Sequence, residues 1–432
     1  MNFRSLLSFC SHISSWSFGK MNSAKEQLEE MGWLEVMLRK HSRENSVAKV
    51  VRVEIEPAVA KGENYASIVT RAKVHIVIGS GRRTVKSVII KRLPEKELYS
   101  KFLEEYSLFK TETKMYADVL SEMEYLMLEK GDMDEKLWPE YVGHKAYDTI
   151  IFNDLREMNY SVVDRKEMLD EAHGYLAIRS LARFHAMSVI MRIRGIINPT
   201  DFAPMFFISN TKATNNLIKG GMKLLARVMK DSWGPEWIDT AERIANAEAT
   251  CCDKLEELRQ VDDQKLNVLN HGDFWTSNIL FKYSPCSGHD YPIGIRFVDF
   301  QMCHWNSYAF DVIHFLYVSL QYELRLSQYE KLIEAYHESL LFTLKFYDYD
   351  SEKIPSLQDV FDELQQKSFY AFICLAAILP VVSTPATNAL DLEKLMLDGD
   401  DVIGHNPEIY RYDVYKRRMK IELTQFVRDG II

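Results

Sequence analysis

Two short stretches decide how this chain is interpreted: HGDFWTSN at residues 271–278 and VDFQ at residues 298–301. Each stretch adjoins an apolar run that predicts a β-strand, so Asp273, Asn278 and Asp299 lie at the ends of adjacent strands. We expect their side chains to point toward one spot. Carboxylate and amide oxygens are the hard donors that Mg²⁺ prefers, and a carboxylate can also accept a proton.

Asp273 and Asn278 are five residues apart, which is the spacing of the kinase catalytic loop H-R-D-x-x-x-x-N. In that loop the Asp accepts the proton of the attacking hydroxyl and the Asn holds Mg²⁺. The pattern alone recurs by chance. An apolar strand that ends in Asp299-Phe300 makes it considerably more specific.

Two other interpretations of these residues stay open. Asp273 and Asn278 could form turn and cap hydrogen bonds while Asp299 merely ends a strand. Alternatively, His271, Asp273, Asp299 and His304 could form a metal-hydrolase cluster, although the sequence lacks further histidines at the spacing of metal ligands.

The composition is that of an ordinary globular protein of at least two lobes. The 432 residues include 53 Lys and Arg and 62 Asp and Glu, which give a net charge of −9 spread along the chain. Binding to nucleic acid through bulk charge is therefore not expected. The six cysteines form no CxxC pair and no Cys/His cluster, so we expect reduced thiols and a cytoplasmic protein.

No segment of the sequence predicts a membrane span. The longest apolar run, residues 369–382, is interrupted by Pro380 and is shorter than the ~20 residues that a span requires, so a buried helix is expected. Residues 1–20 contain six serines and no acid, which is consistent with a targeting signal, and Met21 is a second possible start. We expect residues 1–30 to be a flexible extension.

The N-terminal half of the chain predicts a small sheet lobe, residues 31–155. Apolar alternation and β-branched runs indicate strands at 50–56, 68–78, 84–92, 138–144 and 148–152, the first three as an antiparallel meander. Apolar residues at three- and four-residue intervals predict one long helix at 98–123.

The remainder, residues 156–432, predicts a larger lobe that is mostly helical. Helices are expected at 164–193, 217–229, 237–258 and from residue 311 onward, interrupted by a strand pair at 279–283 and 294–299. The sum is an α+β fold with two lobes.

Lys91 and Glu112 are a candidate ion pair. Lys91 is a cation on an apolar strand, and Glu112 falls on the helix stripe that is expected to pack on the sheet. Pairing would offset the cost of burying each charge and would place the ammonium where it can touch phosphates. Glu105 is the second choice of partner, and two exposed residues are the alternative.

With these residues in hand, the chain resembles the ecdysteroid kinase-like family, which is similar in fold to choline kinases and aminoglycoside phosphotransferases. The resemblance spans roughly residues 31–420 and rests on several short motifs: Gly62 to Ser67, Ile90-Lys91, Phe109 through Glu112 to Tyr116, Asn153-Asp154-Leu155, Leu181 to Ala186, 271–278 and Asp299-Phe300-Gln301. It implies a protein-kinase-like fold and ATP-dependent transfer of the γ-phosphate to an alcohol on a small lipophilic molecule, such as an ecdysteroid or a xenobiotic.

Within that resemblance each motif residue has an implied role. Asp273 is the base, Asn278 and Asp299 hold Mg²⁺, and the nucleotide is bound by Gly62, Asn64 and Ser67 in the phosphate loop, by Lys91 oriented by Glu112, and by the hinge at Asp154 and Leu155. Asp311 is expected either to support the catalytic loop or simply to cap its own helix. His185 is expected to be a satisfied core residue.

Departures from the protein-kinase pattern argue against a protein substrate bound to an activation loop. Gln301 stands where a protein kinase has the Gly of its DFG motif, and no Ala-Pro-Glu segment follows. We expect a monomer that binds a steroid-like or xenobiotic alcohol, with Trp275 in or behind the acceptor site, and neither nucleic acid nor membrane. The alternative function is a nucleotide-binding pseudokinase or scaffold without turnover.

Overall fold

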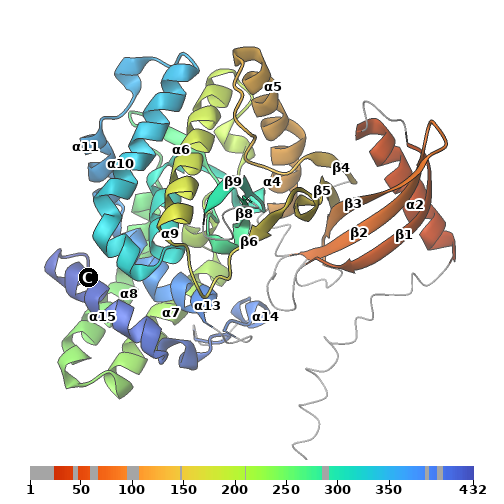
Figure 1. The fold of residues 1–432 in the computed structure, drawn as a ribbon. Coiled ribbons are helices and arrows are strands. Elements are labelled where there is room, and N and C mark those ends of the chain that lie inside the picture. The colour runs from red at the N-terminus through yellow and green to blue at the C-terminus, as the bar shows by residue number, and fades with distance from the viewer. Residues whose placement is uncertain are drawn as a thin grey trace, which may run out of the picture. The chain divides into compact units, whose positions relative to one another are not determined.

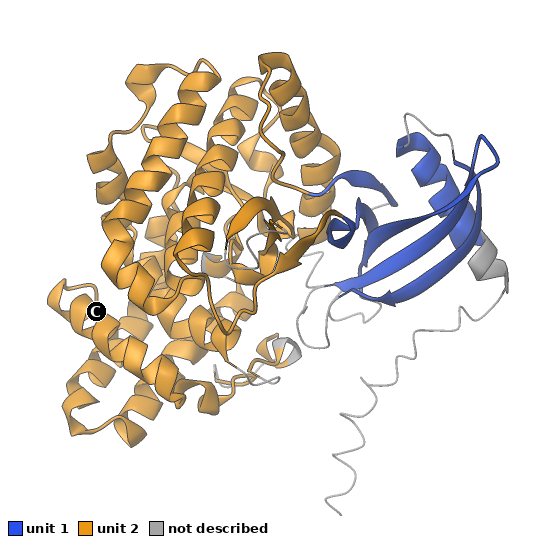
Figure 2. Ribbon diagram, in the orientation of Figure 1, with its two compact units in different colours: residues 1–95, 139–157 blue, residues 96–138, 158–432 orange. Residues whose placement is uncertain are grey.

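The α+β fold class with two lobes is confirmed by a computed structural model, drawn in Figure 1. The structure describes residues 24–41, 47–58, 67–94, 107–145, 148–209, 211–284, 291–384, 389–396 and 402–432. The chain forms two compact units, residues 1–95 with 139–157 and residues 96–138 with 158–432 (Figure 2).

The first unit is an antiparallel five-stranded sheet in the order β1-β2-β3-β5-β4. Its strands are β1 Val47–Pro57, β2 Ile68–Ile78, β3 Arg83–Arg92, β4 Tyr141–Lys145 and β5 Thr149–Asn153. The strands predicted along the first three segments are therefore confirmed. The last two begin slightly later in the sequence than predicted, although the carbonyl of Glu140 before β4 already accepts a hydrogen bond from the amide of Asn153 at the end of β5.

Helix α2 (Ala24–His41) covers one face of this sheet, as Figure 1 shows. Leu34 and Leu38 lie one turn apart on the helix and are buried against Val74 and Ile90 of the central strands. The helix begins at Ala24, within the stretch that the sequence assigned to a flexible extension, and Met31, Trp33 and Met37 add to its contact with the sheet core.

The long helix expected at 98–123 is described from residue 108 and belongs to the second unit. It runs as α4 (Leu108–Lys114), a π-helical turn η2 (Met115–Val119) and α5 (Leu120–Lys130), where Gly131 ends it with φ of +66°. A π-helical turn inside a helix often marks a functional site, and this one carries Tyr116.

The rest of the second unit is helical. Its helices are α6 Glu171–Ile193, α7 Lys212–Ser232, α8 Ile238–Arg259, α9 Ala309–Val318, α10 Tyr322–Phe346, α11 Leu357–Gln366, α12 Ser368–Ile373, α13 Leu379–Ser383, α14 Leu392–Leu395 and α15 Asp413–Arg428. The expected helices are present, but α6 starts only at Glu171 because Asp170 caps it by accepting a hydrogen bond from the amide of His173.

Two small sheets position the site residues. The predicted strand pair is present as β8 (Ile279–Tyr283) and β9 (Pro292–Phe297), joined by β6 (Tyr160–Val162). A second pair, β7 (Asn267–Asn270) with β10 (His304–Ser307), was not predicted because four-residue strands are too short to show a period.

No single helix of the described residues is long and apolar enough to cross a membrane. One bent pair, Ser351–Gln366 with Ser368–Ser383, meets the criterion by length and composition.

Candidate active site

The two site stretches lie side by side because β8 and β9 pair. Ile279 stands opposite Phe297, and the amide of Val298 donates to the carbonyl of Asn278 at 3.0 Å. Asn278 and Asp299 are thereby brought to the same end of this ladder, as expected. Asp273 lies five residues earlier, in the loop that connects β7 to β8.

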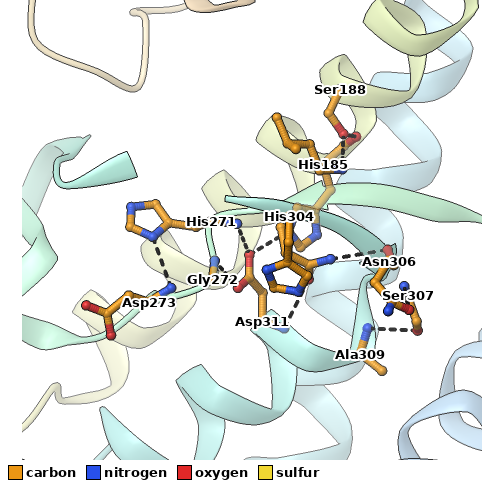
Figure 3. A network of polar contacts seen from close by, with 12 residues as sticks. His185, Ser188, His271, Gly272, Asp273, His304, Asn306, Ser307, Ala309 and Asp311 are labelled. Atoms are coloured by element: carbon orange, nitrogen blue, oxygen red, sulfur yellow. Dashed lines mark hydrogen bonds and ion pairs between the residues drawn. The ribbon is translucent and has the colours of Figure 1, made fainter. Parts of the chain in front are cut away.

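Asp311 holds the catalytic loop in place from the first turn of α9. Its carboxylate accepts hydrogen bonds from the amides of His271, at 2.6 Å, and Gly272, at 2.9 Å, and the ring of His185 lies 3.1 Å away (Figure 3). Burial alone would raise the pKa of Asp311, but the His185 hydrogen bond and the neighbouring histidines bring it down to about 2. The expectation that Asp311 supports the loop is confirmed, and His185 is the satisfied core residue that we predicted.

Gly272 is required by the close approach of two loops. Its φ is +82°, and a Cβ at this position would stand 2.0 Å from the carbonyl oxygen of Met302. Only glycine fits both this conformation and this spacing. The residue that separates His271 from Asp273 is therefore dictated by backbone packing.

Asp273 combines partial burial with several hydrogen bonds. Its side chain is 16% exposed, and the Asn278 amide nitrogen donates to its Oδ2 and to its main-chain oxygen, both at 2.9 Å. Burial and the charge of Asp299 raise the pKa of Asp273 to about 7, although hydrogen bonds from Asn278 and the Trp275 side chain lower it. A carboxylate with a pKa near neutrality is suited to act as a general base at physiological pH.

Asp299 adopts a backbone conformation that only a minority of non-glycine residues adopt. Its φ of 68° and ψ of 57° lie in the left-handed region, and such strain is concentrated at functional sites. The next residue, Phe300, is held by ring contacts with Tyr116 at 5.4 Å, His271 at 4.8 Å and Phe184 at 5.7 Å. The strained turn is therefore fixed by a packed aromatic cluster.

The donor set fits a Mg²⁺ ion that arrives with a nucleotide. The nitrogen of the Asn278 amide is engaged by Asp273, which leaves the amide oxygen as the donor for a metal, and Asp299 adds a carboxylate. Among the described residues no group of three or more His, Cys, Asp or Glu side chains could hold a metal ion. One or two protein ligands completed by phosphate oxygens are the usual arrangement for Mg²⁺. The metal-hydrolase alternative would require a larger group of His, Asp or Glu ligands, and the described residues form none.

Glu112 is buried on α4, and this helix packs against the turn η8 (Phe300–Met302) that follows Asp299. Burial is the main cause that raises the pKa values of Tyr116 and Cys303. The charges of Glu112 and Asp299 raise both further, and that of Asp311 also raises the pKa of Cys303. Lys91 is buried on β3 and belongs to the first unit, whereas Glu112 belongs to the second. Their ion pair stays a prediction.

The hinge candidates Asp154 and Leu155 are buried in the first unit. The Asp154 carboxylate accepts hydrogen bonds from Arg71 Nε at 2.6 Å, Ser87 Oγ at 2.7 Å and the amide of Arg156 at 3.1 Å. Burial opposes its ionisation, but these donors lower the pKa of Asp154. Because its carboxylate is engaged, we expect this residue to contact a nucleotide through its backbone.

The phosphate-loop candidates are only partly described. Ser67 immediately precedes β2, whereas Gly62 and Asn64 lie outside the described residues. Their roles in nucleotide binding stay predictions.

Several large aromatic residues lie in and after the catalytic loop in the sequence, and most of them are core residues. Phe274, Tyr308, Phe310 and Phe315 are fully or almost fully buried, whereas Trp275 and Trp305 are only partly buried. Burial of the four follows from packing between α9 and the catalytic-loop strands. They therefore give no support for an apolar acceptor.

Two further residues near Asp273 were missed by the sequence reasoning. His314 lies on α9 with Nε2 3.9 Å from Asp273 Oδ1, and Phe207 stacks on the His314 ring. The spacing of three between Asp311 and His314 was a signal that both side chains could face the loop. No local pattern points to Phe207.

Comparison with known proteins agrees with this geometry. No curated protein matched the chain. The ecdysteroid kinase-like family matches residues 61–349, a segment that contains Lys91, Glu112, the catalytic loop and Asp299. The chain therefore belongs to the ecdysteroid kinase-like family, a family of kinase-like small-molecule phosphotransferases that generally use ATP and Mg²⁺.

Proposed function

We propose that this protein is an ATP-dependent O-kinase that transfers the γ-phosphate to a hydroxyl of a lipophilic alcohol, such as an ecdysteroid or a hydroxylated xenobiotic. The observation that carries the proposal is the arrangement of Asp273. This carboxylate has a raised pKa, is held by Asn278, and lies within the electrostatic influence of Asp299.

In the proposed reaction Asp273 orients the acceptor hydroxyl and takes its proton. The acceptor oxygen forms a bond to the γ-phosphorus, the bond from that phosphorus to the β-bridging oxygen breaks, and ADP leaves. Asn278 and Asp299 would hold Mg²⁺, which when bound neutralises charge on the phosphates. Lys91, oriented by Glu112, would contact the phosphates, and the backbone at Asp154 and Leu155 would meet the adenine.

The charges around Asp273 bear on the choice of acceptor. Among the described residues, Asp299 and Asp311 are the carboxylates whose charge raises its pKa, and Asp311 is engaged by loop amides and His185. A polycationic aminoglycoside would require a ring of further carboxylates, whereas a neutral alcohol requires only a base and an apolar surround. Trp275, which is partly buried beside Asp273, offers apolar surface and supports the neutral alcohol.

The test is formation of ADP by the purified full chain with ATP and Mg²⁺. The acceptors are an ecdysteroid, other hydroxylated steroids, plant phenolics, choline and kanamycin, and D273N is the matched inactive control. Acceptor-dependent ADP release with a steroid or phenolic supports the proposal. Efficient turnover of choline or kanamycin alone contradicts the acceptor class, and ATP binding without any turnover indicates the scaffold function instead.

A further inference from the structure

His314 presents an unpartnered nitrogen to the candidate base. It lies on α9, is 2% exposed, and its Nε2 is 3.9 Å from Asp273 Oδ1. This nitrogen is buried and has no hydrogen-bond partner among the described residues. Buried polar atoms are nearly always hydrogen-bonded, so such an exception requires an explanation.

The rest of the His314 ring is held firmly. Its Nδ1 is 3.1 Å from the hydroxyl of Tyr370, which is fully buried on α12. Phe207, from the short helix η5 (Phe206–Ile208), stacks on the ring with centroids 5.4 Å apart and planes 24° apart. With one nitrogen bonded and one face covered, the ring has little freedom to turn Nε2 away from Asp273.

The surroundings also determine the charge and the tautomer of the ring. Burial lowers the pKa of His314 to about 4, so the ring is neutral at physiological pH. A carboxylate opposite Nε2 favours the tautomer with the hydrogen on that nitrogen, and Nδ1 then accepts from the Tyr370 hydroxyl. A neutral N–H orients a carboxylate without the strong stabilisation by which a cation would reduce its basicity.

Asp273 is then approached by a donor at each oxygen. Asn278 Nδ2 binds Oδ2 at 2.9 Å, and His314 Nε2 faces Oδ1 at 3.9 Å. The terminal torsion of an aspartate is soft, so rotation of the carboxylate can bring Oδ1 closer to Nε2. Both oxygens still have a lone pair for the acceptor hydroxyl.

We propose that His314 is a positioning residue for Asp273, which fixes Oδ1 through Nε2–H while Asn278 fixes Oδ2, so that the base meets the acceptor hydroxyl in one orientation. This inference rests on the proposed function. If His314 served only to fill space, phenylalanine could replace it, because its ring occupies a similar volume and leaves no buried Nε2 unpaired.

Three variants distinguish the effect of the His314 Nε2 atom from the effect of the ring. H314F keeps a planar ring against Phe207 and removes both nitrogens, H314Q places an amide near the position of Nε2, and H314N places one near Nδ1. His405 supplies the matched control, because it is another histidine with a buried Nδ1 that has no partner among the described residues, and its Nε2 is bonded to the Asn216 carbonyl. H405F therefore makes the same chemical change in a segment that contains none of the site residues.

The assay measures ATP turnover by each full-length variant, first with water as the only acceptor and then with the best alcohol, together with the KM for ATP and thermal unfolding. For H314F we expect a fall in kcat of about tenfold or more, an unchanged KM for ATP and a Tm close to that of the wild type, because the variant removes the unpaired Nε2 but also the Nδ1 that is bonded to Tyr370. H314Q recovers most of the loss, H314N does not, and H405F keeps wild-type kcat.

The outcomes separate this inference from the proposed function. Wild-type kcat in H314F, beside a D273N variant that has lost turnover, overturns the inference alone. A large drop in the Tm of H314F, with equal losses of kcat in H314Q and H314N, shows a structural role and overturns it too. A wild-type chain that turns over no ATP, with water or any alcohol, overturns the proposed function and this inference with it.

Discussion

Replacing Asp311 with asparagine should loosen the catalytic loop, and it should do so without removing a side chain that contacts a substrate. The carboxylate of Asp311 is almost fully buried and receives hydrogen bonds from the amides of His271 and Gly272, with the His185 ring beside it. Asparagine offers one acceptor oxygen in place of two, so one loop amide would face an NH₂ group. A hydrogen bond to a charged group contributes about 1.5–3 kcal/mol.

The pKa of Asp311 gives an independent magnitude. A fall from the ordinary 3.8 to about 2 corresponds to roughly 2 kcal/mol of stability, since each pKa unit is worth about 1.4 kcal/mol. Because the folded-state pKa is depressed, this stability is fully present above pH 3.8 and is lost as the pH falls through about 2. We therefore expect D311N to unfold about 2–3 kcal/mol more easily at pH 7, and the difference should shrink at pH 3.

Urea unfolding of D311N and wild type at pH 7 and pH 3 measures this effect. The kcat of D311N should also fall at least tenfold, because Asp273 comes directly after the two residues whose amides lose their fixed position. D239N is the matched control. Asp239 is exposed and, within the described part of the chain, pairs only with Arg243, one helical turn away, so its loss should change stability by less than about 0.5 kcal/mol. Equal stability of D311N and wild type at pH 7, with kcat unchanged, would refute the reasoning.

Three further predictions concern the same candidate site. D273N should fold and bind ATP but lose kcat by orders of magnitude, and wild-type kcat should rise with pH through about 7 because the base must be deprotonated; a flat pH profile would contradict this. D299A should lose activity together with its Mg²⁺ dependence, which a Mg²⁺ titration compared with D273N can show; a retained Mg²⁺ optimum would remove Asp299 from the metal site. G272A should lose at least about 2 kcal/mol in urea unfolding because its Cβ meets Met302, whereas G195A, which has a φ of +76° and no described atom within 4 Å, shows the strain alone. Equal losses in the two glycine variants would contradict the packing argument.

Local sequence patterns were sufficient to predict most strands of the first unit and the central residues of the candidate site. Strands β2 and β3 follow the alternation of their side chains, which is a property of neighbouring residues along the chain. Asp273 and Asn278 could be recognised because their contact spans only five residues and is made within one loop. The pairing of β8 with β9 then brings Asp299 to the same place.

Other features required the packed structure because they join segments far apart in the chain. The hydrogen bond from the His271 amide to Asp311 joins residues that are 40 apart in the sequence. The sequence alone therefore could not distinguish support of the loop by Asp311 from a simple cap of its own helix. His314 meets Asp273 only because α9 packs beneath the loop, and Phe207 comes from a turn more than a hundred residues away from that helix.

The sequence by itself thus determined which residue types carry the chemistry, because spacing within one loop and alternation within one strand are local constraints. Only the tertiary structure decided which groups surround the base. Burial and the charge of Asp299 raise the pKa of Asp273 to about 7 against the lowering effect of the Asn278 hydrogen bond, and both causes depend on how distant segments pack around one carboxylate. The same packing separates Phe274, a core residue, from Trp275 beside it, which keeps part of its surface exposed.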